Sequence, residues 1–383
     1  MTKGDLPRVL LLTDADVFAG TERHMLDLAG ALADLGVPVR VGCPAPSPLA
    51  EKVGMRGIEV VAIPKRGMVD FAAVKRIAGM LRSGEIDIVH AHNGRTHLAA
   101  ALAVSRAGRG ACVATQHFLF PSRVGRRGPK AWLSAAAHRW TTHRTARIVA
   151  ISDAVKRAAL ARRDATQQQL HTVLNGMMAP DPAALRPAAA IRADLGLPAD
   201  APFIFCAARL EQEKDVPTLI DAMKPVAAAF PAVHCFIAGS GQERASIEAQ
   251  IARHGLSPHV HLLGFRDDVL SLIRAADIFV LPSAVEGFGL VVLEAMALGV
   301  PVIAINAGGP CEIVEPGVTG LLTPPKDSHQ LASALQQLLT DPPLRQRFGS
   351  AGAERFRQHF TAARMACETL AVYNAALGQG GNS

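Results

Sequence analysis

The sequence predicts an α/β protein of two Rossmann-like, doubly wound parallel-sheet domains that face each other across a cleft. Short β-branched runs alternate with longer helical patterns from one end of the chain to the other, which is typical of parallel sheets covered by helices. The 383 residues exceed what one hydrophobic core usually serves, so two domains are expected. A segment rich in Pro and Ala, residues 177–190, breaks the alternation and indicates the hinge.

The expected strands are apolar runs that end in small or polar residues. In the first half of the chain they cover 8–15, 37–43, 58–63, 86–92, 111–117 and 147–152. In the second half they cover 202–210, 233–240, 260–265, 277–283 and 301–308. This order places one domain at 1–176, a linker at 177–200 and a second domain at 201–359. The C-terminal helix, 360–383, is expected to pack back on the first domain.

The positive charge of the chain is concentrated in one region. The formal net charge is +7, yet residues 88–152 hold ten Lys and Arg residues and no Asp or Glu. Residues 120–147, the basic segment, mix cations with Phe120, Trp132 and Trp140. This composition suits an anionic membrane surface, an acidic or phosphorylated glycan, or a solvated helix face. Nucleic acid ranks lower, because no reading motif accompanies the charge and aromatic residues make up only 4% of the chain.

The cysteines and the apolar runs indicate a compartment. None of the six cysteines forms a CxxC pair, which favours buried free thiols in a reducing environment over a disulfide framework or a zinc site. The apolar run near the N-terminus is too short for a signal peptide, and no apolar stretch reaches the roughly 18 residues of a membrane span. We therefore expect a cytoplasmic protein, with the inner face of the cell membrane as a further location.

A loop with two carboxylates follows the expected strand at 277–283. Gly287 and Gly289 let backbone N–H groups and a helix N-terminus approach a phosphate closely, and Glu286 precedes them. Glu294 lies in the apolar helix that follows, where an unpaired ionised carboxylate is costly. Hydroxyls of a sugar ring or a ribose would satisfy it; the alternative is a structural carboxylate paired within the protein.

A pair of cations ends the first strand of the second half. Arg209 closes the strand and Lys214 follows across a short loop, at the edge where doubly wound sheets bind ligands. Two cations there can stabilise the charge that builds on a departing phosphate. The alternative is a pair of solvated loop cations that bridge to Glu211 or Glu213.

Together these segments carry a resemblance to a known family. The pattern EGFGLVVLE within 283–325, with ARLEQEKDVPTLIDAM at 208–223, resembles the retaining, nucleotide-sugar-dependent glycosyltransferases of the GT-B fold, of the family 4 type. The resemblance implies that Glu286 contacts the donor sugar and Glu294 the ribose. It implies that Arg209 and Lys214 neutralise the leaving diphosphate. It assigns diphosphate binding to the backbone of Gly287, Phe288, Gly289 and Leu290.

The resemblance also assigns roles in the first domain, which becomes the acceptor side while 201–359 binds the donor. Gly20 and Glu22 match the family's glycine-rich turn, although Ala19 stands where the family usually has a further glycine. His117 is expected near the donor sugar and His92 on the acceptor side. His90, His92 and His97 suggest a metal site by composition, but no carboxylate lies near them in the sequence and enzymes of this kind need no bound metal.

The function that the resemblance implies is sugar transfer to a hydroxyl with retention of the anomeric configuration, by front-side attack. The donor is a UDP- or GDP-sugar as co-substrate, no cofactor or metal is needed, and the acceptor is a glycan or lipid-linked molecule of the cell envelope. Two alternatives remain: a glycoside hydrolase that uses Glu286 and Glu294 as its carboxylate pair, and a non-catalytic sugar-binding protein.

Overall fold

The computed structural model describes residues 6–64, 67, 70–119, 129–198 and 200–378, and the side chains of 129–133 are not described. The chain divides into two compact units. Unit 1 comprises Met1–Met178 and Thr361–Ser383, and unit 2 comprises Ala179–Phe360. Part of the basic segment, residues 120–128, lies outside the described residues.

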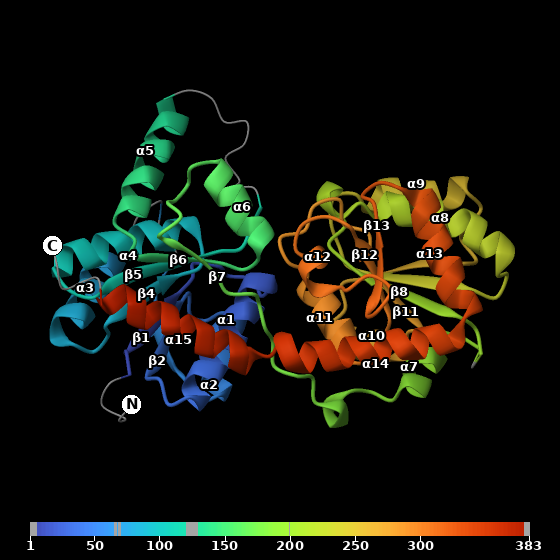
Figure 1. Ribbon diagram of the computed structural model, residues 1–383, viewed down its shortest axis with the longest axis horizontal. Helices are drawn as coiled ribbons and strands as arrows, with labels where there is room; N and C mark the ends of the chain where they lie inside the picture. Colours follow the sequence, from blue (N-terminus) through green and yellow to red (C-terminus); the bar gives the residue numbers. More distant parts are fainter. Residues whose placement is uncertain (1–5, 65–66, 68–69, 120–128, 199, 379–383) are drawn as a thin grey trace. The chain divides into compact units, whose positions relative to one another are not determined.

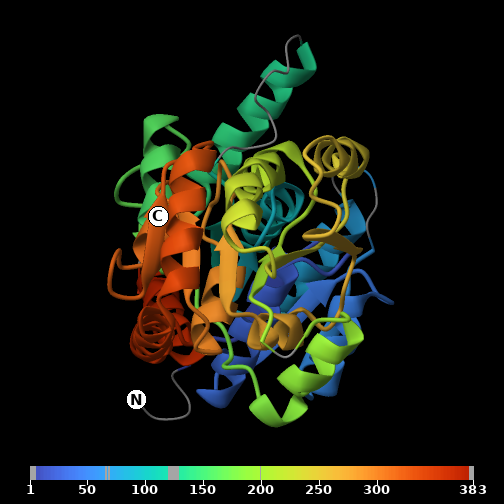
Figure 2. The ribbon, with the colours of Figure 1, turned by 90° about the vertical axis from the view of Figure 1, so that its right-hand side faces the viewer.

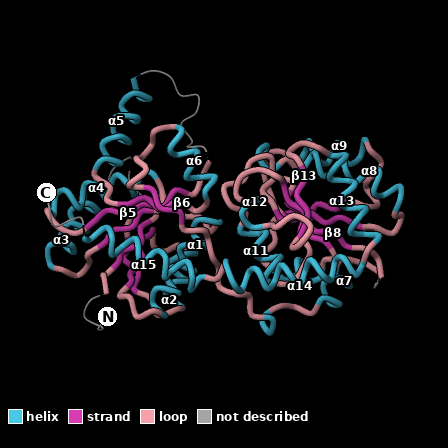
Figure 3. The backbone as a smooth tube through the Cα atoms, viewed as in Figure 1, coloured by secondary structure: helices cyan, strands magenta, loops and turns pink. Residues whose placement is uncertain are grey.

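Unit 1 is a parallel sheet with helices on both faces (Figures 1 and 3). Its strand order is β3-β2-β1-β4-β5-β6-β7. The strands are β1 (Val9–Leu12), β2 (Val39–Cys43), β3 (Glu59–Ala62), β4 (Ile88–Ala91), β5 (Ala111–Gln116), β6 (Arg147–Ala150) and β7 (Leu170–Thr172). The helices are α1 (Gly20–Asp34), α2 (Pro48–Met55), α3 (Phe71–Ser83), α4 (Gly94–Ala107), α5 (Pro129–His143), α6 (Asp153–Ala161) and α15 (Ala362–Gly378).

The central strand β1 shows why this sheet needs cover on both faces. Its four residues are all buried, and successive side chains of a strand point to opposite faces. Val9 and Leu11 join a core formed with α1 and α15, while Leu10 and Leu12 join a second core formed with α3 and α4. A continuous apolar run of this kind is typical of a parallel strand buried on both sides.

Two helices of unit 1 differ from the others. Helix α15 comes from the C-terminal end of the chain, and helix α5 extends beyond the sheet (Figure 1). The C-terminal helix α15 packs against α1, and its buried Tyr373 and Met365 belong to the same core as Val9. Helix α5, in the basic segment, contacts α4 and projects away from the sheet of unit 1 (Figures 1 and 2). Among the described residues, every helix is too short or too polar to cross a bilayer.

Unit 2 is a second parallel sheet, of order β10-β9-β8-β11-β12-β13. Its strands are β8 (Phe203–Ala207), β9 (His234–Ala238), β10 (Val260–Gly264), β11 (Ile278–Leu281), β12 (Val302–Ile305) and β13 (Gly320–Thr323). Its helices are α7 (Ala188–Asp194), α8 (Val216–Ala229), α9 (Arg244–Arg253), α10 (Val269–Ala275), α11 (Leu290–Ala297), α12 (Pro310–Ile313), α13 (Ser328–Thr340) and α14 (Pro342–His359). Two 3₁₀ turns, η1 (Pro182–Ala184) and η2 (Gln212–Lys214), complete the unit.

The segment that we expected to be a linker, 177–200, carries structure of unit 2 from Ala179 onward. It contains η1 and α7, and α7 packs against α10. Arg192 of α7 forms an ion pair with Asp277 (Nη2–Oδ2 3.3 Å), and Asp277 also accepts a hydrogen bond from the backbone N–H of Phe203. These contacts tie the segment to the start of β8 and β11.

An ion pair at the start of the central strands gives a prediction for stability. The Asp87 carboxylate accepts two hydrogen bonds from the Arg8 guanidinium, at 2.8 Å each, and one from the Arg8 backbone N–H at 3.0 Å. Burial raises the pKa of Asp87, but the hydrogen bonds and charge of Arg8 outweigh it, so the net pKa lies below the ordinary 3.8. We expect Asp87→Asn to lower the free energy of unfolding by about 1–2 kcal/mol at pH 7.

The sign of its pH dependence follows from the lowered pKa. A carboxylate of depressed pKa stabilises the fold above its unfolded pKa, and that contribution disappears as the pH falls through the folded pKa. Denaturant unfolding should therefore show the deficit of Asp87→Asn at pH 7 and a shrinking deficit below pH 3.8. An equal deficit at both pH values, or the same deficit in the exposed control Asp34→Asn, would contradict the assignment.

Candidate functional site

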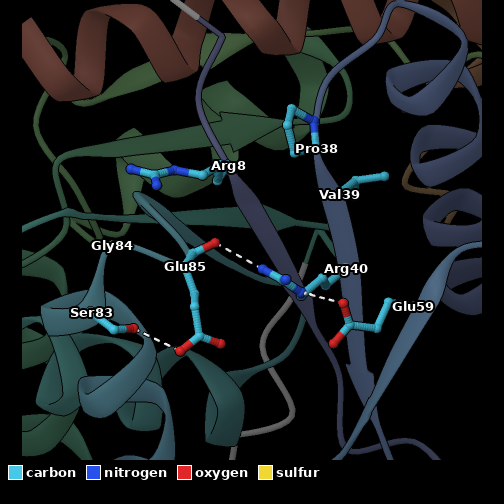
Figure 4. A pocket seen from close by; sticks show the side chains of 8 residues that line it. All are labelled: Arg8, Pro38, Val39, Arg40, Glu59, Ser83, Gly84 and Glu85. Carbon is cyan, nitrogen blue, oxygen red and sulfur yellow. Dashed lines mark hydrogen bonds and ion pairs between the residues drawn. The ribbon is translucent and has the colours of Figure 1, made fainter. Parts of the chain in front are cut away.

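A pocket of unit 1 lies away from the edge where doubly wound sheets bind ligands. It encloses about 450 Å³ at the amino ends of β1 and β2 and is lined by Arg8, Arg40, Glu59 and Glu85, among others (Figure 4). Arg40 donates hydrogen bonds to the Glu59 carboxylate (2.6 Å) and to the Glu85 carbonyl oxygen (2.8 Å). The Arg40 charge is therefore paired within the protein. Ligands of such sheets bind at the opposite, carboxyl ends of the strands.

In unit 2 the carboxyl ends of β8 and β11 bring together two residues that are 72 positions apart. Lys214 Nζ donates a hydrogen bond to Glu286 Oε2 over 2.6 Å. Only 18% of the Lys214 side chain and 15% of the Glu286 side chain are exposed. The Ser283 hydroxyl donates to the same carboxylate oxygen at 3.3 Å. A charge-assisted bond of this geometry, shielded from water, fixes both side chains.

Backbone hydrogen bonds lock the two loops that carry this pair. The N–H groups of Ala284 and Val285 donate to the Glu213 carbonyl oxygen, at 2.9 and 3.3 Å. Lys214 ends the turn η2, and the next residue, Asp215, takes a left-handed conformation with φ 47° before α8 begins. The loop after β8 and the loop after β11 therefore move as one unit, which keeps the Lys214 ammonium at the Glu286 carboxylate.

Arg209 has a different environment from Lys214. Its guanidinium bonds Glu213 at 2.6 Å, and 64% of its side chain is exposed. This pairing is the alternative that the sequence left open for the loop cations. An exposed ion pair of this kind contributes little to stability, so the guanidinium of Arg209 can exchange Glu213 for an anionic ligand at small cost.

Three glycines that sequence reasoning passed over hold the carboxyl edge of unit 2 together. A Cβ at Gly239 would lie 1.8 Å from the Ala208 carbonyl oxygen, and one at Gly241 would lie 2.2 Å from the Leu210 carbonyl oxygen. A Cβ at Gly309 would lie 2.2 Å from the Phe288 Cα atom. The signal was present in the sequence, since small-residue pairs follow the expected strands at 233–240 and 301–308.

The loop from Glu286 to Leu290 is anchored by a buried aromatic side chain. The Phe288 side chain is 2% exposed and packs against Phe360, with ring centroids 6.2 Å apart. Gly289 has φ 102° and precedes α11, whose first residue is Leu290. The Glu286 carbonyl oxygen accepts a hydrogen bond from the Gly309 N–H at 3.1 Å. The side chain of Phe288 is thus an anchor, and the partly exposed residues beside it are Gly287 and Leu290.

Glu294 differs from the sequence expectation. We expected a carboxylate buried inside an apolar helix, but the side chains of α11 that are buried are Val292, Leu293, Ala295 and Met296. Glu294 lies between them on the partly exposed side of the helix. The desolvation cost that was argued for an unpaired buried carboxylate is therefore smaller than expected, because water reaches this face.

The close contact at Gly309 gives a prediction for catalysis. An added methyl group at Gly309 must push the backbone of Gly287 and Phe288, which directly follow Glu286. A shift of about 1 Å in a site can cost about 100-fold in rate, so Gly309→Ala should lower kcat/KM of the reaction that the sequence predicts by about that factor. Steady-state kinetics with Gly79→Ala as control tests this, because a Cβ at Gly79 meets nothing within 4 Å. Equal kinetics of Gly309→Ala and wild type would contradict the contact.

In unit 1 the expected turn before α1 caps the N-terminus of that helix. Glu22 Oε2 accepts a hydrogen bond from the Ala19 backbone N–H at 3.1 Å, and Glu22 is 3% exposed. Burial raises its pKa, with hydrogen bonds from its own and the Ala19 backbone N–H opposing. Ala19 has φ −135°, which any residue adopts, so the missing glycine causes no strain. Gly20 is the exposed first residue of α1.

The expected site histidines lie together at the carboxyl ends of β4 and β5. His92 Nδ1 and His117 Nε2 are 3.2 Å apart, and their side chains are 1% and 9% exposed. Burial, and then the charge of neighbouring histidines, holds the pKa of both well below 6.5. His24 of α1, which sequence reasoning passed over, packs beside both rings.

The other histidines of this region have structural partners. His90 bonds the Tyr373 hydroxyl (2.6 Å) and the Thr115 hydroxyl (2.7 Å), and His97 bonds the Thr145 hydroxyl (2.7 Å). The trio His90, His92 and His97, which composition suggested, is therefore not a set of ligands around one point. The structure brings His92 and His117 together in unit 1, and Lys214 and Glu286 together in unit 2.

Known families and proteins match both units. Residues 18–177 match the family described as Glycosyltransferase Family 4, and residues 188–355 match Glycosyl transferases group 1. The phosphatidyl-myo-inositol mannosyltransferase of Mycobacterium leprae is 31% identical over 355 residues, which is 90% of each chain. The lipopolysaccharide core biosynthesis glycosyltransferase LpsE of Rhizobium meliloti is 34% identical over 170 residues, 44% of this chain and 49% of that protein.

The fold also matches solved structures. The structure of HepE from Anabaena in complex with UDP superimposes with a TM-score of 0.81 at 24% sequence identity. The alignment covers 96% of this chain and all of that one.

Proposed function

The chain belongs to the nucleotide-sugar-dependent glycosyltransferases of the family 4 type, which have the GT-B fold, and from this premise we propose a retaining transfer. The donor is a UDP- or GDP-sugar, the acceptor is a hydroxyl group, and no metal takes part in the chemistry. The observation that carries the proposal is the shielded bond between Lys214 and Glu286 at the carboxyl edge of unit 2.

In this proposal each residue of unit 2 has one task. The Lys214 ammonium and the Arg209 guanidinium bind the diphosphate and stabilise the negative charge that grows on it as the sugar leaves. The Glu286 carboxylate, held by Lys214 and Ser283, accepts hydrogen bonds from the sugar hydroxyls. The backbone N–H groups of the loop from Gly287 to Leu290 bind the diphosphate, and Glu294 accepts hydrogen bonds from the ribose.

The chemical step in the proposal breaks the bond between the anomeric carbon and the diphosphate oxygen. The acceptor oxygen forms its bond to the same face of the anomeric carbon, and its proton passes to the departing phosphate oxygen. His117, with the neighbouring His92, supports the donor sugar and the acceptor from unit 1. A glycoside hydrolase would have no use for Lys214 or for the glycine-rich loops beside it, so that alternative leaves both unexplained.

We further propose a glycan or lipid-linked acceptor in cell-envelope synthesis. Two relatives support this choice by their names, one a mannosyltransferase of phosphatidyl-myo-inositol and the other a glycosyltransferase of the lipopolysaccharide core. The basic segment supports it too, since an excess of Lys and Arg attracts a segment to anionic lipid. Contact with the membrane surface would bring a lipid-linked acceptor to the enzyme.

Proton NMR of the first product tests the proposed stereochemistry. The protein is incubated in EDTA with α-linked UDP- and GDP-sugars and a panel of hydroxyl acceptors, and the anomeric coupling of the new glycoside is read. Retention predicts an α-linked product formed in EDTA. A β-linked product would contradict the retaining mechanism, and turnover that needs an added metal ion would contradict metal independence.

A further inference from the structure

Three imidazoles from three different elements converge in unit 1. His24 lies on α1, His92 follows β4 and His117 follows β5. One ring nitrogen of each lies within 4.8 Å of one ring nitrogen of both others. The ring centroids are 5.4 Å apart for His24–His92, 4.9 Å for His24–His117 and 5.4 Å for His92–His117. The three side chains therefore surround one point; we call them the histidine triad.

Some ring nitrogens of the triad have no hydrogen-bond partner among the described residues. Within the described part of the chain, neither nitrogen of His24 has a hydrogen-bond partner of ordinary geometry, and the same is true of His92 Nε2. The Asn175 side chain lies near enough to His24 to favour its charged form. Buried polar atoms almost always have partners in the protein, in water or in an ion, so the His24 ring, with both nitrogens unpartnered in the described chain, points to a species that the triad holds.

The protonation state of the triad suits a metal ion. Burial lowers the pKa of His24 to about 4 and holds those of His92 and His117 well below 6.5. Neutral imidazole is the form that donates a lone pair to a metal, and burial disfavours the charged form of all three rings.

We propose that His24, His92 and His117 form a binding site for a divalent transition metal ion, with Zn²⁺ as the best fit. Three imidazoles with a water in the fourth position are an established donor set for Zn²⁺, and imidazole also suits Cu²⁺ and Ni²⁺. In a tetrahedral site with Zn–N bonds of about 2.1 Å, the nitrogens lie about 3.4 Å apart. His92 Nδ1 and His117 Nε2 are already 3.2 Å apart, and a ring nitrogen of His24 lies within 4.8 Å of both rings' ligand atoms.

The site has a consequence for transfer, which rests on the proposed function. His117 is the most exposed member of the triad, at 9%, and is the residue we propose to support the donor sugar. A metal ion that coordinates His117 occupies the nitrogen that a sugar hydroxyl would use. Zn²⁺ is therefore an inhibitor in this proposal, and not a participant in the chemistry.

Binding is measured first, with no reference to activity. Equilibrium dialysis of the full chain against Zn²⁺ should show one tightly bound ion, and Co²⁺ in its place should give the intense visible absorption of four-coordinate cobalt. X-ray absorption of the Zn²⁺ complex should show three imidazoles at about 2.0–2.1 Å. His24→Gln should weaken binding by about 100-fold or more, since loss of even an outer-shell partner costs 10–100-fold.

A second group of histidines in unit 2 provides the matched control. His234 and His261 lie 3.1 Å apart (Nδ1–Nε2) on neighbouring strands of the sheet, and His261→Gln removes that pair while leaving the triad intact. His261→Gln should bind Zn²⁺ like the wild type. The proposal is overturned if wild type binds no ion, if His261→Gln rather than His24→Gln abolishes binding, or if the absorption spectrum shows fewer than three imidazoles. If His24→Gln fails to fold, the X-ray absorption spectrum of the wild-type Zn²⁺ complex still shows whether three imidazoles bind the ion.

Activity is measured second, as the ratio of donor turnover with and without Zn²⁺. A fall of that ratio in the wild type and not in His24→Gln supports inhibition through His117. If Zn²⁺ binds without inhibiting turnover, the metal site stands, but the proposed inhibition through His117 is wrong. A protein that binds Zn²⁺ but turns over no nucleotide sugar would overturn the proposed function alone.

Discussion

Lys214→Ala is expected to lower kcat for sugar transfer by about 10²–10³-fold, the loss that follows when one preorganised donor to a developing negative charge is removed. The effect is expected to be large because Lys214 is shielded, with 18% of its side chain exposed, and is held at 2.6 Å from Glu286. The same substitution should weaken binding of the nucleoside diphosphate, since in the proposed site the ammonium also contacts this product. Steady-state kinetics and calorimetric titration with UDP or GDP measure the two losses.

The control for Lys214 is an exposed lysine of the same unit. Lys224 lies on α8, and its side chain is exposed, so Lys224→Ala should leave both kcat and nucleotide affinity unchanged. Loss of activity in both variants would indicate a general charge effect. Wild-type turnover in a folded Lys214→Ala protein would remove Lys214 from the site.

Glu286→Gln is the second change with a large expected effect, and its profile differs from that of Lys214→Ala. The amide keeps the shape of the side chain but loses the charge that holds Lys214 and that, in the proposed site, accepts hydrogen bonds from the sugar hydroxyls. We expect kcat to fall by about 100-fold or more, while affinity for the free nucleoside diphosphate changes little because that ligand carries no sugar. Calorimetry with the nucleotide, beside kinetics with the nucleotide sugar, separates the two contributions.

Two comparisons make the Glu286 result decisive. Glu248→Gln alters a half-exposed carboxylate that pairs with Arg244 on α9 and should have wild-type kinetics. Lys214→Ala combined with Glu286→Gln should cost much less than the product of the single effects, because residues that act as a unit are not additive. Fully multiplicative losses would show that the 2.6 Å bond does not couple the two residues in catalysis.

The fold class and the central strands were predictable from the sequence because they depend on long apolar runs. The prediction of two doubly wound parallel-sheet domains is confirmed by both sheets and by the structural match. Strands β7 and β13 were missed. β7 has three residues, of which only Leu170 is buried, and β13 begins at Gly320 with its middle residues partly exposed. Edge strands bury one face or less, so they lack the apolar run that marks a central strand.

The candidate site was predictable in part, for a similar reason. Polar residues that follow buried strands stand out in the sequence, and Lys214, Glu286 and His117 do so. The pairing of Arg209 with Glu213 and the partial exposure of Glu294 depend on the packing of side chains in the folded protein, which the sequence pattern does not reveal. His24 gave no signal because it lies at an ordinary position of a buried helix, and only the fold brings it beside His92 and His117. The roles of all these residues remain predictions.

The measurement that tests the central claim most directly is calorimetric titration of the wild type and Lys214→Ala with UDP, GDP and ADP in EDTA. The account predicts that one nucleotide binds the wild type at one site without metal and binds Lys214→Ala at least about tenfold more weakly, the loss of about 1.4 kcal/mol. If no nucleotide binds while free sugars or oligosaccharides do, the paired Lys214 and Glu286 do not form a donor site, and a hydrolase or a sugar-binding protein becomes the better account.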